Sequence, residues 1–290
     1  MMPKIHHLQT GLVLVRPAQM AGQGKGLARQ AHVLFDDQWS DWLPINAWLI
    51  EHDEGLILVD TGETARVHQR GYHPRWHPFF RRAAAFRVRP EDEIGPQLRS
   101  LGVRTGDIRH VILTHLHTDH AGGLEHVIGL KTWVHPTEWR RAQGIGGVVQ
   151  GYLPHRWPKW WQPELLRFEP RPHGPFAERM SITERGDVFV VPTPGHTPGH
   201  VSVIVQGSPS FFLAGDTSYT QPLLEQRVVD GVSPDERVAR GTIERILSLA
   251  AQEPLVYLPS HDPESASRLS RQLTLVPRFE HRDERATTRT

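Results

Sequence analysis

The sequence contains no cysteine, so neither a disulfide nor a metal–thiolate bond can hold this fold together. It also lacks an apolar run long enough to cross a bilayer, and Leu12–Val15 is too short for the apolar region of a secretion signal. The formal net charge is only +1, whereas a nucleic-acid partner usually requires a strongly basic face. These absences predict a cytoplasmic protein without a membrane or nucleic-acid partner.

The most informative segment is Leu113–Gly123, which follows the apolar residues Val111 and Ile112. Three histidines and one aspartate lie within six residues: His115, His117, Asp119 and His120. In an extended chain, residues two apart point to the same side, so His115 and His117 can share one ion. Imidazole and carboxylate together suit zinc, iron, cobalt or manganese. The alternative, a surface cluster of histidines, leaves this density of ligands unexplained.

This H-x-H-x-D-H segment resembles the signature of the metallo-β-lactamase superfamily. Further polar residues follow in the same order after apolar or Pro-Gly segments: Asp60, His196, Asp216 and His261. Each of these alone would be an ordinary polar residue near a turn. The resemblance implies an α/β fold, an αββα sandwich with a dinuclear metal site at the sheet edge. We expect a single domain over residues 1–277 and a mobile, charged tail over 278–290.

The resemblance also implies a role for each candidate ligand. His115, His117 and His196 are expected at the first ion, and Asp119, His120 and His261 at the second. Asp216 is expected to bridge the two ions, because each carboxylate oxygen can serve one of them. Asp60 either anchors a ligand histidine or caps a turn, and His200 is expected behind the site. The expected cofactors are two divalent ions, most typically zinc, with iron, cobalt or manganese as alternatives.

Within the superfamily, the chain looks most like the N-acyl homoserine lactone lactonases, the quorum-quenching branch. Leu56–Gly62, Asp216–Thr220 and Tyr257–Asp262 carry this likeness. It implies that a metal-bridging hydroxide opens the ring of a small-molecule lactone. Asp119 would move the proton, and Tyr219 would donate to the lactone carbonyl; otherwise Tyr219 is a surface residue. The likeness is weak over 64–89 and 138–175, the segments expected to shape the acyl pocket.

Several rival functions share the same scaffold. The absence of cysteine excludes families that bind their second zinc through a thiolate. A histidine rather than a glutamate at His117 favours hydrolysis over diiron redox chemistry, and a bridging Asp216 disfavours a β-lactam substrate. A thioesterase of the glyoxalase II type usually has a further C-terminal domain, and little chain follows His261. Phosphotriester hydrolysis stays open, whereas a nuclease or a metal-free binding module fits the residues less well.

Other segments give weaker expectations. Residues 17–42 look like an irregular connection, Pro90 is expected to start a helix that ends at Gly102, and Ser233 is expected to cap a helix whose first residue is Pro234. The tryptophan-rich segment 138–175 is either a pocket wall or partner surface, as in a homodimer, or a satellite core. Three apolar residues are either acyl contacts or core residues: Met20, Phe79 and Phe80. Strands are expected over 12–15, 45–50, 56–59, 109–114, 131–135, 187–191, 201–205, 211–214 and 255–258.

Overall fold

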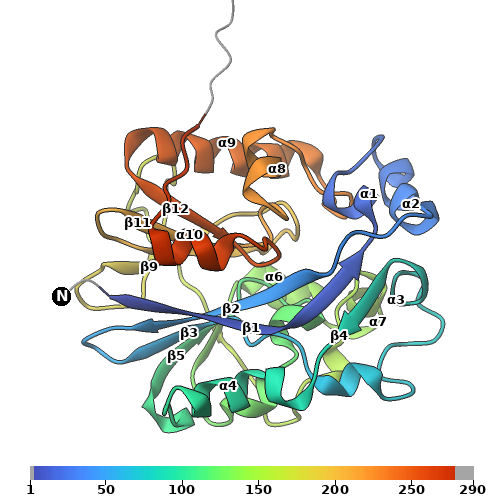
Figure 1. Ribbon diagram of the computed structural model, residues 1–290, viewed down its shortest axis with the longest axis horizontal. Helices are drawn as coiled ribbons and strands as arrows, with labels where there is room; N and C mark the ends of the chain where they lie inside the picture. Colours follow the sequence, from blue (N-terminus) through green and yellow to red (C-terminus); the bar gives the residue numbers. More distant parts are fainter. Residues whose placement is uncertain (1–2, 278–290) are drawn as a thin grey trace, which may run out of the picture.

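Two β-sheets pack face to face at the centre of the protein, and helices cover their outer faces (Figure 1). The computed structural model describes residues 3–277, and the expected mobile tail lies outside this range. The layers follow the order helix, sheet, sheet, helix, which confirms the predicted αββα fold class. Within the described residues, no helix combines the length and apolar character needed to cross a membrane.

The strands expected from the sequence are present within residues 3–277, with a longer first strand and additional short ones. The first sheet has the order β4-β1-β2-β3-β5-β6-β7, and the second has the order β12-β11-β10-β9-β8. Their bounds are β1 Lys4–Val15, β2 Leu43–Glu51, β3 Leu56–Val59, β4 Ala84–Arg87, β5 Ile108–Ile112, β6 Thr132–Val134, β7 Glu164–Leu165, β8 Met180–Ser181, β9 Val188–Pro192, β10 Val201–Val205, β11 Ser210–Gly215 and β12 Leu255–Pro259.

Successive side chains of β2 serve two different cores, because a strand alternates its faces. Ala47 and Leu49 point outward and pack with Ile94 and Leu98 of the helix below the first sheet. Trp48 and Ile50 point inward, into the core shared by the two sheets. From the second sheet, that shared core receives Val190, Val203, Leu213 and Leu258.

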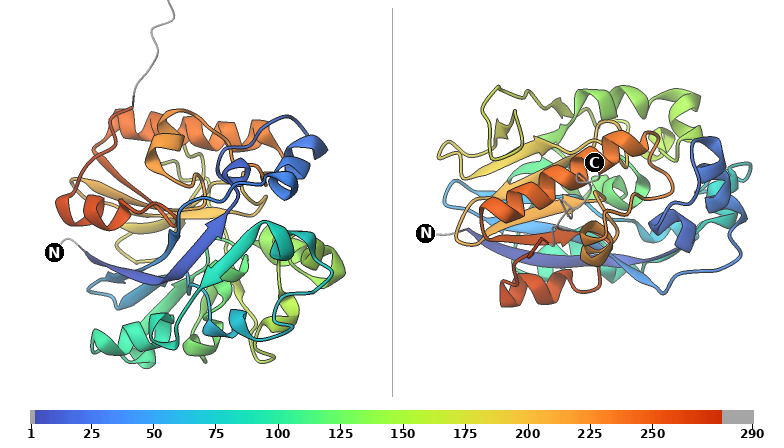
Figure 2. Two further views of the ribbon diagram at one scale, coloured as in Figure 1. Left: turned by 45° about the vertical axis from the view of Figure 1, so that its right-hand side comes forward. Right: turned by 90° about the horizontal axis from the view of Figure 1, so that it is seen from above.

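Helices lie on the outside of both sheets. Figure 2 shows the long helix α9 (Glu236–Gln252) across the outer face of the second sheet, where it buries Ile243, Ile246 and Leu247. The remaining α-helices are α1 Pro17–Met20, α2 Leu27–Phe35, α3 Pro78–Arg82, α4 Ile94–Ser100, α5 Thr118–Ala121, α6 Pro136–Arg141, α7 Gly144–Val149, α8 Gln221–Glu225 and α10 Ser265–Arg271. Short 3₁₀ helices occupy Ala65–His68, Pro90–Asp92, Thr105–Asp107, Leu124–Val127 and Pro154–Arg156.

Strand direction brings the candidate ligands to one edge of the sandwich. β3 and β5 are parallel, so Asp60 and His115, which follow them, emerge at the same end. β11 and β12 are also parallel, and Asp216 and His261 follow these strands. β9 runs in the direction of β11, since β10 is antiparallel to both, so the loop with His196 emerges at that end too.

Residues 17–42 are more regular than expected, because they contain α1 and α2. Helix α1 is a single turn that begins at Pro17, too short to show a helical period. Helix α2 follows a glycine-rich stretch and buries Arg29 and Val33, one helical turn apart. The prediction of an irregular connection was wrong because the glycines before α2 suggested a loop. The buried face of α2 includes an arginine, so the helix shows no simple apolar pattern.

The helix expected from Pro90 to Gly102 is interrupted. Its first turn is a 3₁₀ helix, and α4 starts only at Ile94, because Glu93 is extended with ψ 152°. Contacts from elsewhere in the chain hold the Glu93 carboxylate, which accepts the Ala65 N–H at 2.8 Å and lies beside His126. Tertiary contacts therefore override the local helical preference.

The N-cap residue predicted for helix α9 was also wrong. Asp235, not Ser233, caps α9, with its Oδ1 accepting the N–H groups of Arg237 and Val238 at 2.9 and 3.2 Å. Pro234 consequently lies before the helix. The backbone N–H of Ser233 is already bound by Asp230 at 2.6 Å, which keeps Ser233 in the preceding turn.

Candidate metal centre

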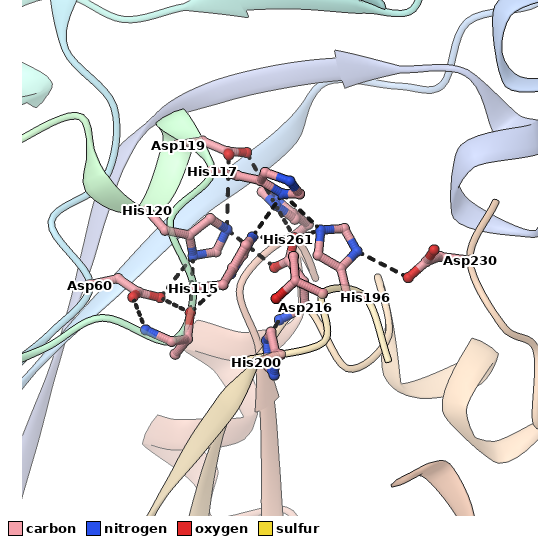
Figure 3. A network of polar contacts seen from close by, with 12 residues as sticks. Asp60, His115, His117, Asp119, His120, His196, His200, Asp216, Asp230 and His261 are labelled. Atoms are coloured by element: carbon pink, nitrogen blue, oxygen red, sulfur yellow. Dashed lines mark hydrogen bonds and ion pairs between the residues drawn. The ribbon is translucent and has the colours of Figure 1, made fainter. Parts of the chain in front are cut away.

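Three histidine rings meet at the first group of expected ligands. Nδ1 of His117 lies 3.0 Å from Nε2 of His115 and 3.1 Å from Nε2 of His196 (Figure 3). His115 and His117 follow β5, whereas His196 lies in the loop between β9 and β10. All three nitrogens come within 4.8 Å of one another, so they can hold a single ion.

The second expected group is assembled in the same way from Asp119, His120 and His261. Oδ2 of Asp119 lies 3.4 Å from Nε2 of His261, and Oδ1 lies 4.0 Å from Nε2 of His120. Asp216 lies between the two groups. Its Oδ1 is 3.3 Å from Nε2 of His120, and its Oδ2 is 3.5 Å from Nε2 of His196. The carboxylate thus has the position expected of a bridge.

Acceptors outside the site fix the orientation of three of these rings. Nδ1 of His120 donates to Asp60 at 2.8 Å, Nδ1 of His196 donates to Asp230 at 3.0 Å, and Nδ1 of His261 donates to the carbonyl of Pro44 at 2.9 Å. Because each Nδ1 carries the proton, each neutral ring presents the lone pair of Nε2 to the site.

Asp60 anchors a ligand histidine, the first of its two expected roles. Besides His120, its carboxylate accepts the backbone N–H and the hydroxyl of Thr114, both at 2.8 Å. Its backbone has a positive φ of 62°, which is uncommon for an aspartate and directs the side chain under the ligand loop. Asp230 accepts the Nδ1–H of His196 in the same way, and the sequence analysis did not predict this role.

The charges of the site favour a cation. Burial opposes ionisation of Asp216, but His261 and His120 outweigh it and hold the pKa of Asp216 well below its usual value. Burial likewise disfavours protonated His196, but Asp230 and Asp216 raise the pKa of His196. Burial and the neighbouring His196 instead lower the pKa of His117 to about 3. Ionised carboxylates next to a neutral imidazole form a cation-binding environment.

The side-chain atoms that lack a hydrogen bond suit two divalent ions as partners. Nε2 of His120 and Oδ1 of Asp216 are buried and lie 3.3 Å apart, yet neither makes a hydrogen bond to the described residues. Buried polar atoms without a hydrogen bond are uncommon and call for a missing partner. Nitrogen and carboxylate oxygen are the donors that zinc and its neighbours in the periodic table prefer. A pair of divalent ions therefore satisfies this donor set.

Tyr219 lies at the edge of the same site. Its ring stacks on that of His261, with 5.4 Å between centroids and 23° between planes, and only 3% of the residue is exposed. Burial, followed by Asp216 and Asp230, raises the pKa of Tyr219 well above its usual value, so the hydroxyl keeps its proton. The alternative of a surface tyrosine is therefore wrong.

His200 lies behind the site, as expected. Its Nε2 accepts the backbone N–H of Asp216 at 2.9 Å, and its Nδ1 contacts the hydroxyl of Thr193 at 2.9 Å. Gly215 precedes this contact at a φ of +55°, and a Cβ there would lie 2.5 Å from Nε2 of His200. Both the backbone angle and the space require glycine beside Asp216.

Glu138 is a second residue that the sequence reading missed. It is fully buried, and burial raises the pKa of its carboxyl. Its Oε1 accepts the N–H of Leu116, between two ligand histidines, and its Oε2 accepts the hydroxyl of Thr197, next to His196. Glu138 thus joins the two loops that supply the first group of ligands.

A cavity of about 440 Å³ opens beside the ligands. Asp119, Tyr219 and His261 line it, as do residues of helices α2, α3 and α7, which gather at one end of the molecule (Figure 1). Phe79 and Phe80 line the cavity, whereas Met20 is absent from its wall and packs with the β1 and β2 core. Other apolar lining residues are Val13, Val15, Val33, Leu34, Phe86, Val149 and Val232.

The tryptophan-rich segment 138–175 combines two of its expected roles. Trp139, Trp157 and Trp161 lie 5.0–5.6 Å apart between ring centroids and pack against the core below the first sheet, and none of the three lines the cavity. Residues 149–152 of the same segment do line the cavity, and Trp160 is exposed. The segment therefore supplies both a satellite core and part of the pocket wall, and the homodimer stays a prediction.

Residues 40–261 match the profile of the metallo-beta-lactamase superfamily. The chain belongs to this superfamily. It is 31% identical over 229 residues to a probable metallo-hydrolase of Mycobacterium tuberculosis, covering 77% of this chain but only 65% of that relative. It is also 31% identical over 232 residues to an N-acyl homoserine lactonase of Bacillus thuringiensis, covering 77% and 82% of the two chains. The predicted family is therefore confirmed.

Solved structures share the fold of this superfamily member. An N-acyl homoserine lactone hydrolase with N-hexanoyl-L-homoserine at its catalytic metal centre aligns with a TM-score of 0.72 and 23% identity, covering 92% of this chain and 96% of that one. A dizinc quorum-quenching lactonase aligns with a TM-score of 0.60 and 16% identity, covering 90% and 88%. At these identities the likeness establishes the fold alone.

Proposed function

We propose that this superfamily member is a dinuclear metallohydrolase that opens lactone rings, with N-acyl homoserine lactones as its substrates. The observation that carries the proposal is the joint presence of three candidate ligand groups and Tyr219 beside one cavity. The lactonases among its relatives support the lactone as the substrate. Zinc is our choice for the two ions, and the same donors also suit iron, cobalt and manganese.

His115, His117 and His196 would hold one ion, Asp119, His120 and His261 would hold the second, and Asp216 lies close enough to both groups to contribute to either. Two divalent ions held there would lower the pKa of a water molecule to near neutrality and polarise a carbonyl. The remaining steps belong to the protein. Ring opening adds water across the acyl C–O bond and yields a carboxylate and an alcohol.

Asp119 is our candidate for moving the proton. Its side chain is 15% exposed and borders the cavity, whereas Asp216 is buried among the histidines. A carboxylate here can take the proton of the attacking water and deliver it to the leaving ring oxygen. Tyr219, which keeps its proton, can donate to the carbonyl oxygen as negative charge develops there.

The cavity wall also suits an apolar tail. Valine, leucine and phenylalanine side chains from β1, α2 and α3 are among the residues that line it. Residues 76–80 and 149–152 both line the cavity, as expected of the segments where the likeness to lactonases is weak. A substrate with a polar ring and an apolar acyl chain matches a cavity lined by both kinds of side chain.

The test combines metal content with a substrate comparison. We expect close to two divalent ions per purified chain, measured by plasma emission spectroscopy. Initial rates are then compared on N-hexanoyl homoserine lactone, a glutathione thioester and an aryl phosphotriester at equal metal loading. We expect the lactone to have the highest kcat/KM. Fewer than one ion per chain, or a faster thioester or phosphotriester, would overturn the proposal.

The Asp216→Asn variant provides a metal control. An amide cannot supply the negative charge shared by the two groups, so we expect this variant to retain less metal and to lose turnover. We also expect chelation of the wild type to lower its thermal midpoint, and added zinc to restore it, because a ligand that binds only the folded state stabilises it. A wild type whose midpoint and turnover do not respond to chelation would contradict metal dependence.

A further inference from the structure

Gln19 is held firmly beside the candidate metal centre. It lies in the one-turn helix α1, where its N–H donates to the carbonyl of Arg16 at 2.8 Å. Its own carbonyl accepts the N–H of Gly231 at 2.7 Å, and the neighbouring Gly22 N–H donates to Val229 at 3.0 Å. These bonds attach α1 to the turn that contains Asp230, the partner of His196. The position of Gln19 is therefore fixed relative to the ligands.

Only one of the two polar atoms of the Gln19 side-chain amide makes a hydrogen bond. Gln19 is 5% exposed and lines the cavity together with Tyr219, Asp119 and His261. Its Nε2 donates to the hydroxyl oxygen of Tyr219 at 2.6 Å. Its Oε1 is buried and has no partner among the described residues. A buried acceptor without a donor is costly, and in a cavity wall it indicates that a ligand supplies the donor.

The contact with Tyr219 also constrains the tyrosine proton. Since the tyrosine oxygen accepts from Nε2, its own O–H is free to point elsewhere, and the carbonyl of a substrate is the acceptor that the proposed function requires. Nε2 and Oε1 belong to one amide group. A substrate that meets both Tyr219 and Oε1 must therefore carry an N–H only a few bonds from its scissile carbonyl.

We propose that Gln19 is a specificity-determining residue whose Oε1 accepts the amide N–H of an α-acylamino lactone. This inference rests on the proposed function and adds the residue that recognises the amide of its substrate. In such a lactone, one carbon separates the scissile carbonyl from the amide nitrogen, which matches the separation described above. A lactone that carries an alkyl tail without an amide leaves Oε1 unpaired and is disfavoured.

The first test compares two substrates on the wild type and two variants. The substrates are N-hexanoyl homoserine lactone and a γ-alkyl lactone of matched length. We expect Gln19→Leu to lower kcat/KM on the acylamino lactone by about tenfold more than on the alkyl lactone. Gln23→Leu, an exposed position in the following loop, is the matched control and should change neither value. Equal losses on both lactones would overturn the role of Gln19 in specificity.

Gln19→Glu separates recognition of the substrate from the contact with Tyr219. A carboxylate still accepts the substrate N–H but cannot donate to the tyrosine oxygen. We expect this variant to turn over both lactones more slowly and yet to keep the wild-type preference for the acylamino lactone. A preference reduced as far as in Gln19→Leu would contradict the proposal.

Binding of non-hydrolysable lactams gives a readout that does not depend on turnover. Calorimetry should show that Gln19→Leu weakens the acylamino γ-lactam about tenfold and the alkyl γ-lactam little. Gln19→Met serves if the leucine variant fails to fold. Unchanged affinity for both lactams would overturn the inference. Failure of the metal-loaded wild type to open any lactone would instead overturn the proposed function, so the two failures are distinguishable.

Discussion

Asp230 accepts the Nδ1–H of His196 at 3.0 Å, and its other oxygen accepts the N–H groups of Val232 and Ser233 at 2.9 and 2.6 Å. One carboxylate thus fixes both a ligand ring and the turn that carries it. An outer carboxylate of this kind sets the proton position and the basicity of the histidine.

Replacing Asp230 with asparagine should weaken metal binding. The amide oxygen stays with the two backbone donors, so the NH₂ group must face Nδ1 of His196, which can no longer donate. We expect an affinity loss of roughly 10- to 100-fold. Competition with a chromophoric chelator measures it, and Asp41→Asn, at an exposed position, is the control. Affinities within twofold of the wild type would contradict this role for Asp230.

Replacing Tyr219 with phenylalanine should slow lactone opening without removing the metals. The stacked ring on His261 is retained, and only the hydroxyl is lost. Removal of one donor to a developing oxyanion typically costs about 10²–10³ in kcat. Steady-state turnover of N-hexanoyl homoserine lactone, measured with metal content on the same sample, checks this. Turnover equal to the wild type would exclude Tyr219 from the mechanism.

Helix α9 offers a test of its cap. Asp235→Ala removes the acceptor for two backbone N–H groups, and we expect a loss of about 1 kcal/mol in the free energy of unfolding. Ser233→Ala is the matched control, because the Ser233 hydroxyl makes no hydrogen bond to the described residues. Urea unfolding compares the two variants. A larger loss for Ser233→Ala would restore serine as the cap.

His73 should make stability depend on pH. Its ring stacks on Phe80, with 4.3 Å between centroids, and burial followed by Arg156 lowers its pKa from 6.5 to about 4. Between these two values the unfolded chain binds a proton that the folded chain does not. Its contribution is therefore complete above pH 6.5 and is lost as the pH falls towards 4.

The His73→Phe variant isolates this contribution, because phenylalanine preserves stacking without titrating. We expect its unfolding free energy to fall less steeply below pH 6.5 than that of the wild type, by at most about 1.4 kcal/mol per pH unit. Urea unfolding at several values between pH 4.5 and 7.5 measures the slopes. Parallel slopes for the two proteins would show that His73 does not titrate in this range.

The sequence predicted the candidate ligands from the spacing of His115 and His117 and from the resemblance of its motifs to the superfamily. The structure shows why these residues meet: His115 and His117 follow one strand, and Asp60, Asp216 and His261 follow strands whose ends lie at one edge. No comparable signal points to Asp230 or Gln19. Asp230 lies in a turn and Gln19 in a one-turn helix too short to show a period, and both make their contacts across the fold, so neither period nor motif marks them.

The errors in the helices have a similar origin. Ser233 and Asp235 both suit the start of a helix, and the choice between them depends on Asp230, which binds the backbone of Ser233. Glu93 interrupts a locally favourable helix because Ala65 and His126 engage its carboxylate. In each case a distant contact decides between locally acceptable alternatives.

Each of the three candidate ligand groups takes two members from the segment His115–His120 and its third from a loop of the second sheet. If ions bind as proposed, each would therefore draw ligands from both halves of the sandwich. Metal binding would then link the two halves in addition to the core that they share. Removing the ions would weaken the attachment of one half to the other as well as the chemistry.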